Sequence, residues 1–402
     1  MSVAPPEPAR FPRIFVVALA FAQLVSWGSL YYAFAVIVEP MRAELGWDKP
    51  SVNAALSIGL AVTGLVSFSI GRVIDRYGGR LLMTTGSIAA AVLLLVWSQI
   101  TALWQLYAIW IAMGVIFAMV LYEPVFAVIA RELKADYRRG IITITLLGGL
   151  ASTVFIPLTH GLVEGLGWRM ALVFLGVLQV PCGVLIHWLT LKGTGAGEGR
   201  HQVAELVPPD RMRRAVRNPI FWLLSLSYAA HAFMFTTITF HILPLLGERG
   251  IAMNEAVLAY SLVGPAQVLG RSVVFLFEAR IGVRLAGIVA TTLPAIGAAL
   301  LFAATPGSLA LMAFAVLYGS GMGVKTIVQA TAAPEFLGRE GYGALQGALA
   351  IMVYVTQAAA PFLAALLWVY GGGYDLVMWS ILGAAVLSAA AFAAAASLPA
   401  AR

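Results

Sequence analysis

The sequence predicts an all-α membrane protein whose twelve transmembrane helices form two pseudo-symmetric six-helix bundles. Its 402 residues are 61% hydrophobic and only 11% charged, and the mean hydropathy is +0.92. Soluble domains carry roughly 25% charged residues, so most of this chain is expected to lie in a bilayer. The number of long apolar segments and an internal repeat support the same fold class.

Apolar segments of about twenty residues, long enough to cross the hydrocarbon core, occur twelve times along the chain. The predicted helices cover 14–38, 51–73, 80–99, 102–130, 139–162, 168–191, 219–245, 255–277, 283–304, 308–332, 342–370 and 375–397.

The longest polar stretch falls in the middle of the chain and divides it into two similar halves. We therefore expect an N-terminal six-helix bundle over 1–191, a cytoplasmic linker over 192–217 and a C-terminal six-helix bundle over 218–402. The halves repeat at an offset of 204 residues, which pairs Pro40 with Pro244, Gly46 with Gly250, Arg76 with Arg280, Gly78 with Gly282 and Arg80 with Arg284.

The net charge of +7 is explained by where the cations fall. Nineteen of the 25 Lys and Arg lie in segments on the side of the N-terminus, and four lie on the other side: Arg42, Lys49, Arg169 and Arg249. By the positive-inside rule both termini are cytoplasmic, in a multi-pass protein of the cell (inner) membrane. The expected surroundings are lipid, with no nucleic-acid partner, and the chain is expected to act as a monomer.

The sequence favours neither a metal site nor an enzyme. Its single cysteine, Cys182, lies in an apolar run, so a disulfide framework and a cysteine zinc site are excluded. Signatures of zinc peptidases, serine hydrolases and P-loop nucleotide-binding proteins are missing from the sequence. We therefore expect no cofactor, no metal ion and no catalytic residue.

Three ionisable side chains fall inside the predicted helices: Glu123, Arg271 and Lys325. A charge costs several kcal/mol at the bilayer centre unless it faces a partner or a cavity, so each is a candidate functional residue. A structural ion pair, or a long side chain reaching the interface, is the alternative for each.

Arg271 and Lys325 are the predicted substrate-binding cations. Arg271 lies eleven residues before Gly282, which places it about 16 Å deep if the helix continues to that turn. Its planar guanidinium matches a carboxylate. Lys325 follows Gly319, Gly321 and Gly323, which let a neighbouring helix or a substrate approach closely. Because Arg271 and Lys325 together outweigh the negative charge of Glu123, the pocket is expected to be positive and to favour an anionic substrate.

Glu123 and His231 are the predicted proton-coupling residues. Glu123 precedes Pro124, which kinks the helix and frees backbone carbonyls around the acid. Without a permanent partner Glu123 is a proton carrier, whereas paired with Lys325 or Arg271 it is a gate. His231 lies near the middle of its segment, although both it and His241 also fit hydrogen-bonded helix residues.

Polar and aromatic residues in two further segments complete the predicted substrate site. Gln23, Trp27 and Tyr31 recur at i, i+4 and i+8 and therefore share one helix face. Gln357 lies in the eleventh segment. Helix packing and interfacial anchoring account for such residues equally well.

The segment Gly71–Arg80 reads GRVIDRYGGR and stands between two long apolar runs. Its pattern G-R-x-x-D-R-x-G-x-R resembles the signature loop between the second and third helices of the major facilitator superfamily of transporters. The resemblance implies two parallel six-helix repeats that rock against each other around a midplane site. It also implies a conformational gate formed by Gly71, Asp75, Arg76, Gly78 and Arg80.

Further details resemble the branch that includes monocarboxylate and oxalate/formate transporters. They are Gly46-Trp47, Tyr122-x-Pro124, Arg138-Arg139-Gly140 and an arginine in the eighth segment, which in that branch binds the substrate carboxylate. The lysine that some members carry in the first segment is absent, and Lys325 stands on the tenth segment instead of the eleventh.

Together these features predict a secondary active transporter that moves a small organic anion, a monocarboxylate, by rocker-switch alternating access with H+ as the coupling ion. The alternative is an efflux carrier for drugs or other small amphiphiles, which needs an aromatic pocket in place of a cation pair. A membrane-embedded receptor or enzyme is less well supported, because neither an appended soluble domain nor a catalytic motif is found.

Overall fold

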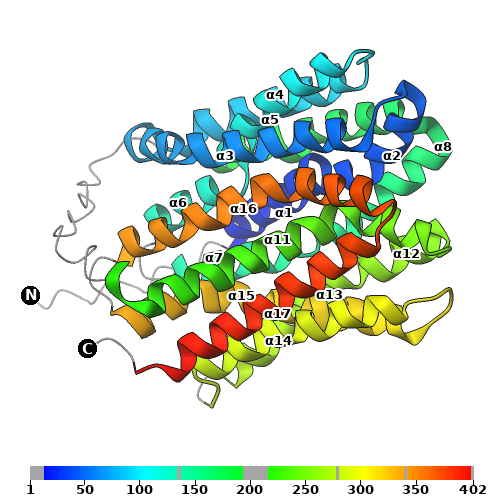
Figure 1. Cartoon of the computed structure of the whole chain (residues 1–402). Coiled ribbons are helices and arrows are strands. Elements are labelled where there is room, and N and C mark those ends of the chain that lie inside the picture. The colour runs from blue at the N-terminus through cyan, green and yellow to red at the C-terminus, as the bar shows by residue number, and fades with distance from the viewer. Residues whose placement is uncertain (1–12, 134–136, 193–215, 278–279, 339–341, 400–402) are drawn as a thin grey trace, which may run out of the picture.

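The computed structural model describes residues 13–133, 137–192, 216–277, 280–338 and 342–399 (Figure 1). Nearly all of the predicted linker, 192–217, lies outside these residues, so the predicted domain boundaries stay a prediction. Every long element within the described ranges is a helix, as expected where backbone polar groups must be satisfied inside lipid.

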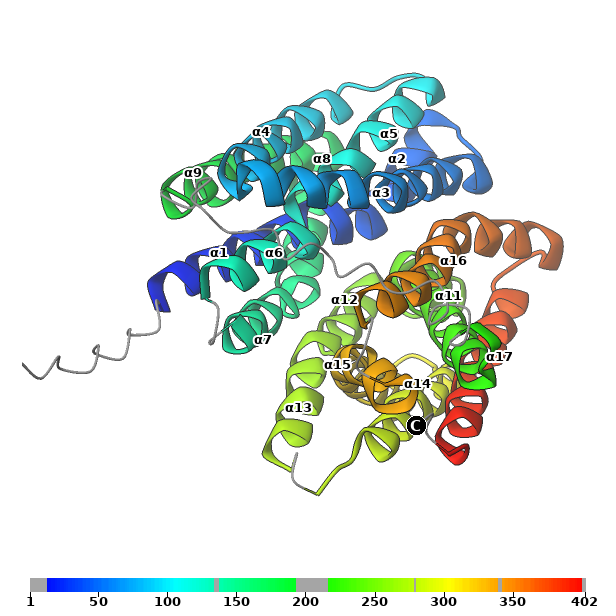
Figure 2. The same ribbon diagram turned by 90° about the vertical axis from the view of Figure 1, so that its left-hand side faces the viewer.

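Two groups of helices lie side by side (Figure 2). The first group contains α1 (Arg13–Ser26), the π-helical η1 (Trp27–Tyr32), α2 (Ala33–Leu45), α3 (Lys49–Tyr77), α4 (Gly79–Trp97), α5 (Leu103–Val120), α6 (Tyr122–Leu133), α7 (Tyr137–Gly148), α8 (Ala151–Gln179), the π-helical η3 (Val180–Leu185) and α9 (Ile186–Thr190). The second group contains α11 (Pro219–Glu248), α12 (Met253–Ser261), α13 (Val263–Leu276), α14 (Val283–Leu300), the 3₁₀ turn η4 (Leu301–Ala303), α15 (Leu309–Leu337), α16 (Tyr342–Gly371) and α17 (Asp375–Ser397).

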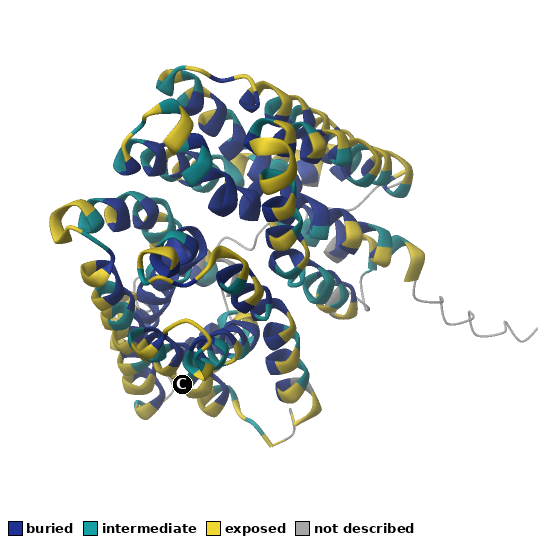
Figure 3. Cartoon of the chain, turned by 90° about the vertical axis from the view of Figure 1, so that its right-hand side faces the viewer, coloured by how far each residue is buried: buried dark blue, intermediate teal, exposed yellow. Residues whose placement is uncertain are grey.

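The predicted twelve-helix membrane fold is confirmed. Eleven stretches within the described residues are long and apolar enough to cross a membrane. The longest, Arg139–Thr190, has 52 residues and bends at Gly167, whose φ is 79°. It therefore contains both the fifth and the sixth predicted helices. Figure 3 shows the buried residues on the helix faces that point into each group and the exposed ones on the outer faces.

The internal repeat is visible in the backbone at one end of the molecule. Gly46 and Gly250, which are 204 residues apart, both have positive φ, at 69° and 76°. At the opposite end the repeat is lost, because Gly78 has a φ of 79° whereas Gly282 has a φ of −66°. The second copy of this turn thus has a different backbone conformation from the first.

The loop expected at residues 71–80 is much shorter in the structure. Helix α3 continues to Tyr77 and α4 begins at Gly79, so Gly78 alone connects them. The left-handed region that Gly78 occupies favours glycine. Gly79 cannot carry a side chain for a different reason, since a Cβ there would lie 2.4 Å from Val128 Cγ2.

The glycines before Lys325 hold three helices together. A Cβ on Gly319 would lie 2.6 Å from the Val263 carbonyl, and a Cβ on Gly323 would lie 2.1 Å from the Gln267 carbonyl, both in α13. Gly321 faces α14 in the same way. The expected close approach is confirmed, and it fixes α15 against the helix that carries Arg271.

Candidate functional site

The two ends of the molecule provide the reference for the site. We call the end with the α2–α3 and α11–α12 connections the Lys49 end, at the right of Figure 1, and the end with the α3–α4 connection the Gly78 end, at the left with both termini.

Arg271 bridges the two helix groups from α13. It is 9% exposed, and its Nη1 donates a hydrogen bond to the Thr145 carbonyl of α7 in the first group. Nη2 donates to Oε1 of Gln267 at 3.2 Å, and Nε has no partner among the described residues. The guanidinium therefore has only neutral oxygens around it in the described part of the chain.

The depth predicted for Arg271 was wrong. That prediction took the helix as continuous to Gly282, but α13 ends at Leu276. Arg271 thus lies five residues, or about 7.5 Å, from the end of its helix. This distance is about half of the predicted 16 Å.

Lys325 is buried within the second group. It is 8% exposed and lies near the middle of α15, where Nζ donates to Oε1 of Gln329 at 2.7 Å and lies 5.4 Å from the centre of the Tyr228 ring. The two cations share no partner among the described contacts. Arg271 faces the first group, whereas Lys325 faces its own.

Glu123 pairs with neither cation in the described structure. Its Oε1 accepts a hydrogen bond of 2.7 Å from the hydroxyl group of Tyr354 in α16, so this contact also joins the two groups. Glu123 is exposed at the start of α6. The described partner of Glu123 is thus a neutral hydroxyl and neither Arg271 nor Lys325, and its role as a proton carrier stays a prediction.

The predicted stripe on the first helix is interrupted by a π-helical segment. From Trp27 the wider turn changes the α period on which the prediction rested. Gln23 donates to the Val120 carbonyl at 2.6 Å inside the first group. The Trp27 ring instead lies 4.8 Å from the Tyr122 ring, and Tyr31 contacts Phe240 of the second group at 4.9 Å.

The other predicted polar residues have different surroundings. Gln357 is half-buried and makes no hydrogen bond in the described ranges. His231 is 2% exposed, with Nε2 at 3.0 Å from the Met322 sulfur and Nδ1 without a described partner. His241 is bonded through both nitrogens, to the Tyr374 hydroxyl at 3.0 Å and to the Pro361 carbonyl at 3.1 Å.

The predicted gate residues contact only their own group where the structure describes them. Arg80 donates to the Trp188 carbonyl at 3.0 Å, and Arg76 stacks near Tyr77. A Cβ on Gly71 would meet nothing within 4 Å. The Asp75 side chain lies outside the described part of the structure, so its role stays a prediction.

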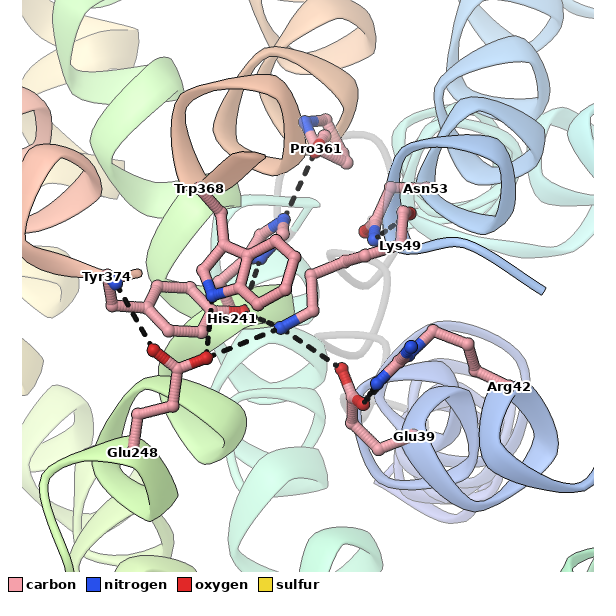
Figure 4. A network of polar contacts seen from close by, with 9 residues as sticks. All are labelled: Glu39, Arg42, Lys49, Asn53, His241, Glu248, Pro361, Trp368 and Tyr374. Atoms are coloured by element: carbon pink, nitrogen blue, oxygen red, sulfur yellow. Dashed lines mark hydrogen bonds and ion pairs between the residues drawn. The ribbon is translucent and has the colours of Figure 1, made fainter. Parts of the chain in front are cut away.

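A polar cluster at the Lys49 end was missed by the sequence reasoning (Figure 4). It joins Lys49 of the first group to the second group and contains Glu39, Lys49, His241, Glu248, Trp368 and Tyr374. Burial, followed by the nearby carboxylates of Glu39 and Glu248, raises the pKa of Tyr374 above its ordinary value. Its hydroxyl therefore stays protonated. The sequence indicated this cluster only through Lys49, one of the four cations on the side opposite the N-terminus.

Contacts between the groups run from the Lys49 end to the middle of the molecule. After the Lys49 cluster come the hydrogen bonds from His160 to Asn254 and from Thr153 to the Ser261 carbonyl, at 2.8 and 2.7 Å. The bonds of Arg271 and Glu123 come last.

Two groups of long apolar helices with buried cations, one of which bonds across the groups, are typical of a membrane transport protein. A family model described as Major Facilitator Superfamily matches residues 19–361. The chain belongs to this superfamily, so it is a multi-pass membrane transporter and not an enzyme.

Similar proteins agree with this assignment. Monocarboxylate transporter 13 of Rattus norvegicus is 27% identical over 337 residues, which cover 81% of this chain and 73% of that protein. A bacterial homologue of the human lysosomal transporter Spinster, in an inward-facing and unoccupied conformation, has a TM-score of 0.71 at 15% identity and covers 97% of this chain and 98% of its own. The nucleoside transporter NupG has a TM-score of 0.71 at 16% identity, covering 96% and 99%. These two structures share the fold.

The bond between Glu123 and Tyr354 predicts strongly non-additive mutations. Glu123→Gln and Tyr354→Phe should each lower the melting temperature of the purified protein, and the double variant should lose little more than either single variant, because both remove one charge-assisted bond. Thermal unfolding in detergent measures this. Tyr370→Phe, which removes an exposed hydroxyl from the same helix, is the control and should melt as the wild type does. Fully additive losses would contradict the pairing.

Proposed function

We propose that this transporter moves a small organic anion, a monocarboxylate, and that Arg271 binds the carboxylate. What supports this is the burial of a guanidinium with only neutral oxygens as described partners and with Nε unpartnered. An ionised group out of water is costly unless an opposite charge compensates it. A carboxylate substrate provides that charge, and the planar fork of arginine can hold it through two hydrogen bonds.

Arg271 is suited to couple binding to movement. It lies where α13 faces α7, and its present acceptor is a backbone carbonyl of the other helix group. A bound carboxylate would compete for the same N–H donors and so change the contact between the groups. In our proposal the groups rock in this way, and the described contacts correspond to a state closed at the Lys49 end.

Lys325, Trp27, Tyr31, Gln23 and Gln357 have lesser roles in the proposal. Lys325 is a second positive charge that attracts an anion, and in the structure its Nζ donates a hydrogen bond to Gln329. Tyr31 and Trp27, whose rings lie 5.0 Å apart, supply an aromatic wall that reaches Phe240 of the second group through Tyr31. Gln23 is committed to a backbone carbonyl, which makes it the weakest of the substrate-binding candidates.

Proton coupling is assigned in the proposal to Glu123, with His231 as the second candidate. Glu123 joins the groups through Tyr354, and protonation would remove the negative charge that this hydroxyl binds. The strength of the bond between the groups then depends on the proton. His231 has an unpartnered nitrogen in the same helix group as Lys325.

An efflux carrier for small amphiphiles is the second candidate function. The cluster of Trp27, Tyr31, Tyr32 and Tyr122 rings favours it, because aromatic faces bind apolar ligands with little specificity. The similarity to a monocarboxylate transporter and the buried Arg271 favour the carboxylate. Counterflow of a panel of labelled monocarboxylates into proteoliposomes distinguishes the two.

Arg271→Lys tests the substrate site. Although charge is kept, the bidentate contact is lost, so affinity for the carboxylate found by counterflow should fall about thirtyfold, or ~2 kcal/mol. Calorimetry on folded protein measures it. Arg284→Lys is the matched control, since that guanidinium binds backbone carbonyls of Ala396 and Leu398 within its own group. Wild-type affinity in both Arg271→Lys and Arg271→Ala would remove Arg271 from the site.

We further propose that the Gly78 end and both termini are cytoplasmic, in the cell (inner) membrane, on the charge distribution described above. Single cysteines replace Lys192 at one end and Met253 at the other, both exposed, in a Cys182→Ser background. A membrane-impermeant maleimide added to intact cells should label Met253→Cys and spare Lys192→Cys until the cells are permeabilised. The reverse pattern would invert the orientation.

A further inference from the structure

Lys49 is a buried cation whose side chain enters the opposite helix group. It stands at the first position of α3 and is 4% exposed. Its Nζ lies 3.2 Å from the hydroxyl of Tyr374 and 3.9 Å from Oε1 of Glu248, both in the second group. It also lies 4.0 Å from the centre of the Trp368 ring and 4.6 Å from that of Tyr374 (Figure 4). Two ring faces and a carboxylate are the features that bind an ammonium group.

The second group holds this pocket in shape without help from Lys49. The indole N–H of Trp368 donates to Oε1 of Glu248 at 2.6 Å, and the backbone N–H of Tyr374 donates to Oε2 at 3.2 Å. His241 fixes the hydroxyl of Tyr374. Its Nε2 faces the Pro361 carbonyl, which can only accept, so its Nδ1 accepts the tyrosine proton and leaves the hydroxyl oxygen for Lys49.

The internal repeat supplies a comparison within the chain. Glu44 stands 204 residues before Glu248 and likewise accepts an indole N–H at 2.6 Å, from Trp168. Its cation is Arg169, at 3.0 Å, from the same helix group. The equivalent carboxylate of the second group thus takes its cation from across the interface. The glutamate at this position of the repeat therefore binds a cation of its own group in the first half of the chain. In the second half it binds a cation of the other group.

The other cations of this end stay within their own groups. Arg42 pairs with Glu39 at 2.9 Å, Arg169 pairs with Glu44, and Arg249 donates to the carbonyls of Phe302 and Ala304. Among the four Lys and Arg counted on this side, Lys49 alone crosses to the other group in the described contacts.

The contacts are arranged so that, on separation, Lys49 keeps a carboxylate and Glu248 keeps its hydrogen-bond donors. Glu39 lies 3.6 Å from Lys49 in the same group and would move with it. Glu248 would keep the N–H donors of Trp368 and Tyr374. Removing a charge from a buried pair is costly when the remaining partner has nothing else to bind, and here both have a second partner. The contact is therefore suited to break and form repeatedly.

We propose that Glu248, Trp368 and Tyr374 form a lysine-binding pocket, and that insertion of Lys49 into it is the latch that closes this end of the transporter. This inference rests on the alternating access of the proposed function. It names the residues that set the equilibrium between the closed and open states of the Lys49 end. Opening at the Lys49 end requires Lys49 to leave the pocket and be hydrated, so weakening the pocket favours the open state.

The test uses a cysteine reporter beneath the latch. Ser261→Cys, in a Cys182→Ser background, places a thiol at a 7% exposed position whose backbone carbonyl accepts the Thr153 bond between the groups. Its rate of reaction with a hydrophilic maleimide is measured on purified protein in detergent. Lys49→Met and Glu248→Gln should each raise the rate at least tenfold, and Lys49→Arg should raise it less because the charge is retained.

Arg169→Gln is the matched control, since it removes the cation of Glu44, the equivalent carboxylate of the first group, and its rate should equal that of the parent. Melting temperature and gel filtration show which variants are folded, and the two latch variants break the contact from opposite sides. A parental rate in whichever of them folds would overturn the latch. Because no substrate is present, that result is independent of whether Arg271 binds a carboxylate.

Discussion

The structure depends on how charges are compensated where water is absent. At the Lys49 end a buried cation has two carboxylates within 4 Å. Arg271 and Lys325 are equally buried, yet their described partners are amide and carbonyl oxygens. A lysine with acids of its own is compensated without a ligand. A guanidinium with neutral partners lacks a counter-ion until an anion arrives, which is why we place transport chemistry at Arg271 and mechanical closure at Lys49.

The distribution of contacts between the groups gives the same division of roles. Bonds near the Lys49 end include one between two polar side chains that our proposal does not use, His160 and Asn254. Those at the middle involve Arg271 and Glu123, to which we assign the anion and the proton. A ligand can shift a conformational equilibrium only by as much as it binds one state better. In our proposal the ligand-sensitive contacts are therefore the ones that Arg271 and Glu123 make between the groups.

Sequence reasoning predicted the fold well and the site in part. Twelve apolar segments and intramembrane charges are local features, so the helices and the burial of Arg271 and Lys325 followed from them. Contacts between residues distant in sequence could not be predicted in this way. Glu248 ends an apolar run, and nothing in that run shows that Lys49, 199 residues earlier, contacts it. The π-helical turn at Trp27 and the end of α13 at Leu276 were not predicted, and they alter the helix period and the helix length on which two predictions rested.

The most direct test of the account is whether the charge of the substrate is what the buried guanidinium recognises. Calorimetric titration of the purified wild-type protein would compare the monocarboxylate that gives counterflow with its neutral amide, which has nearly the same size and shape. We expect saturable binding of the carboxylate and at least a thirtyfold weaker response to the amide. Equal binding of the two compounds would contradict an anion site at Arg271.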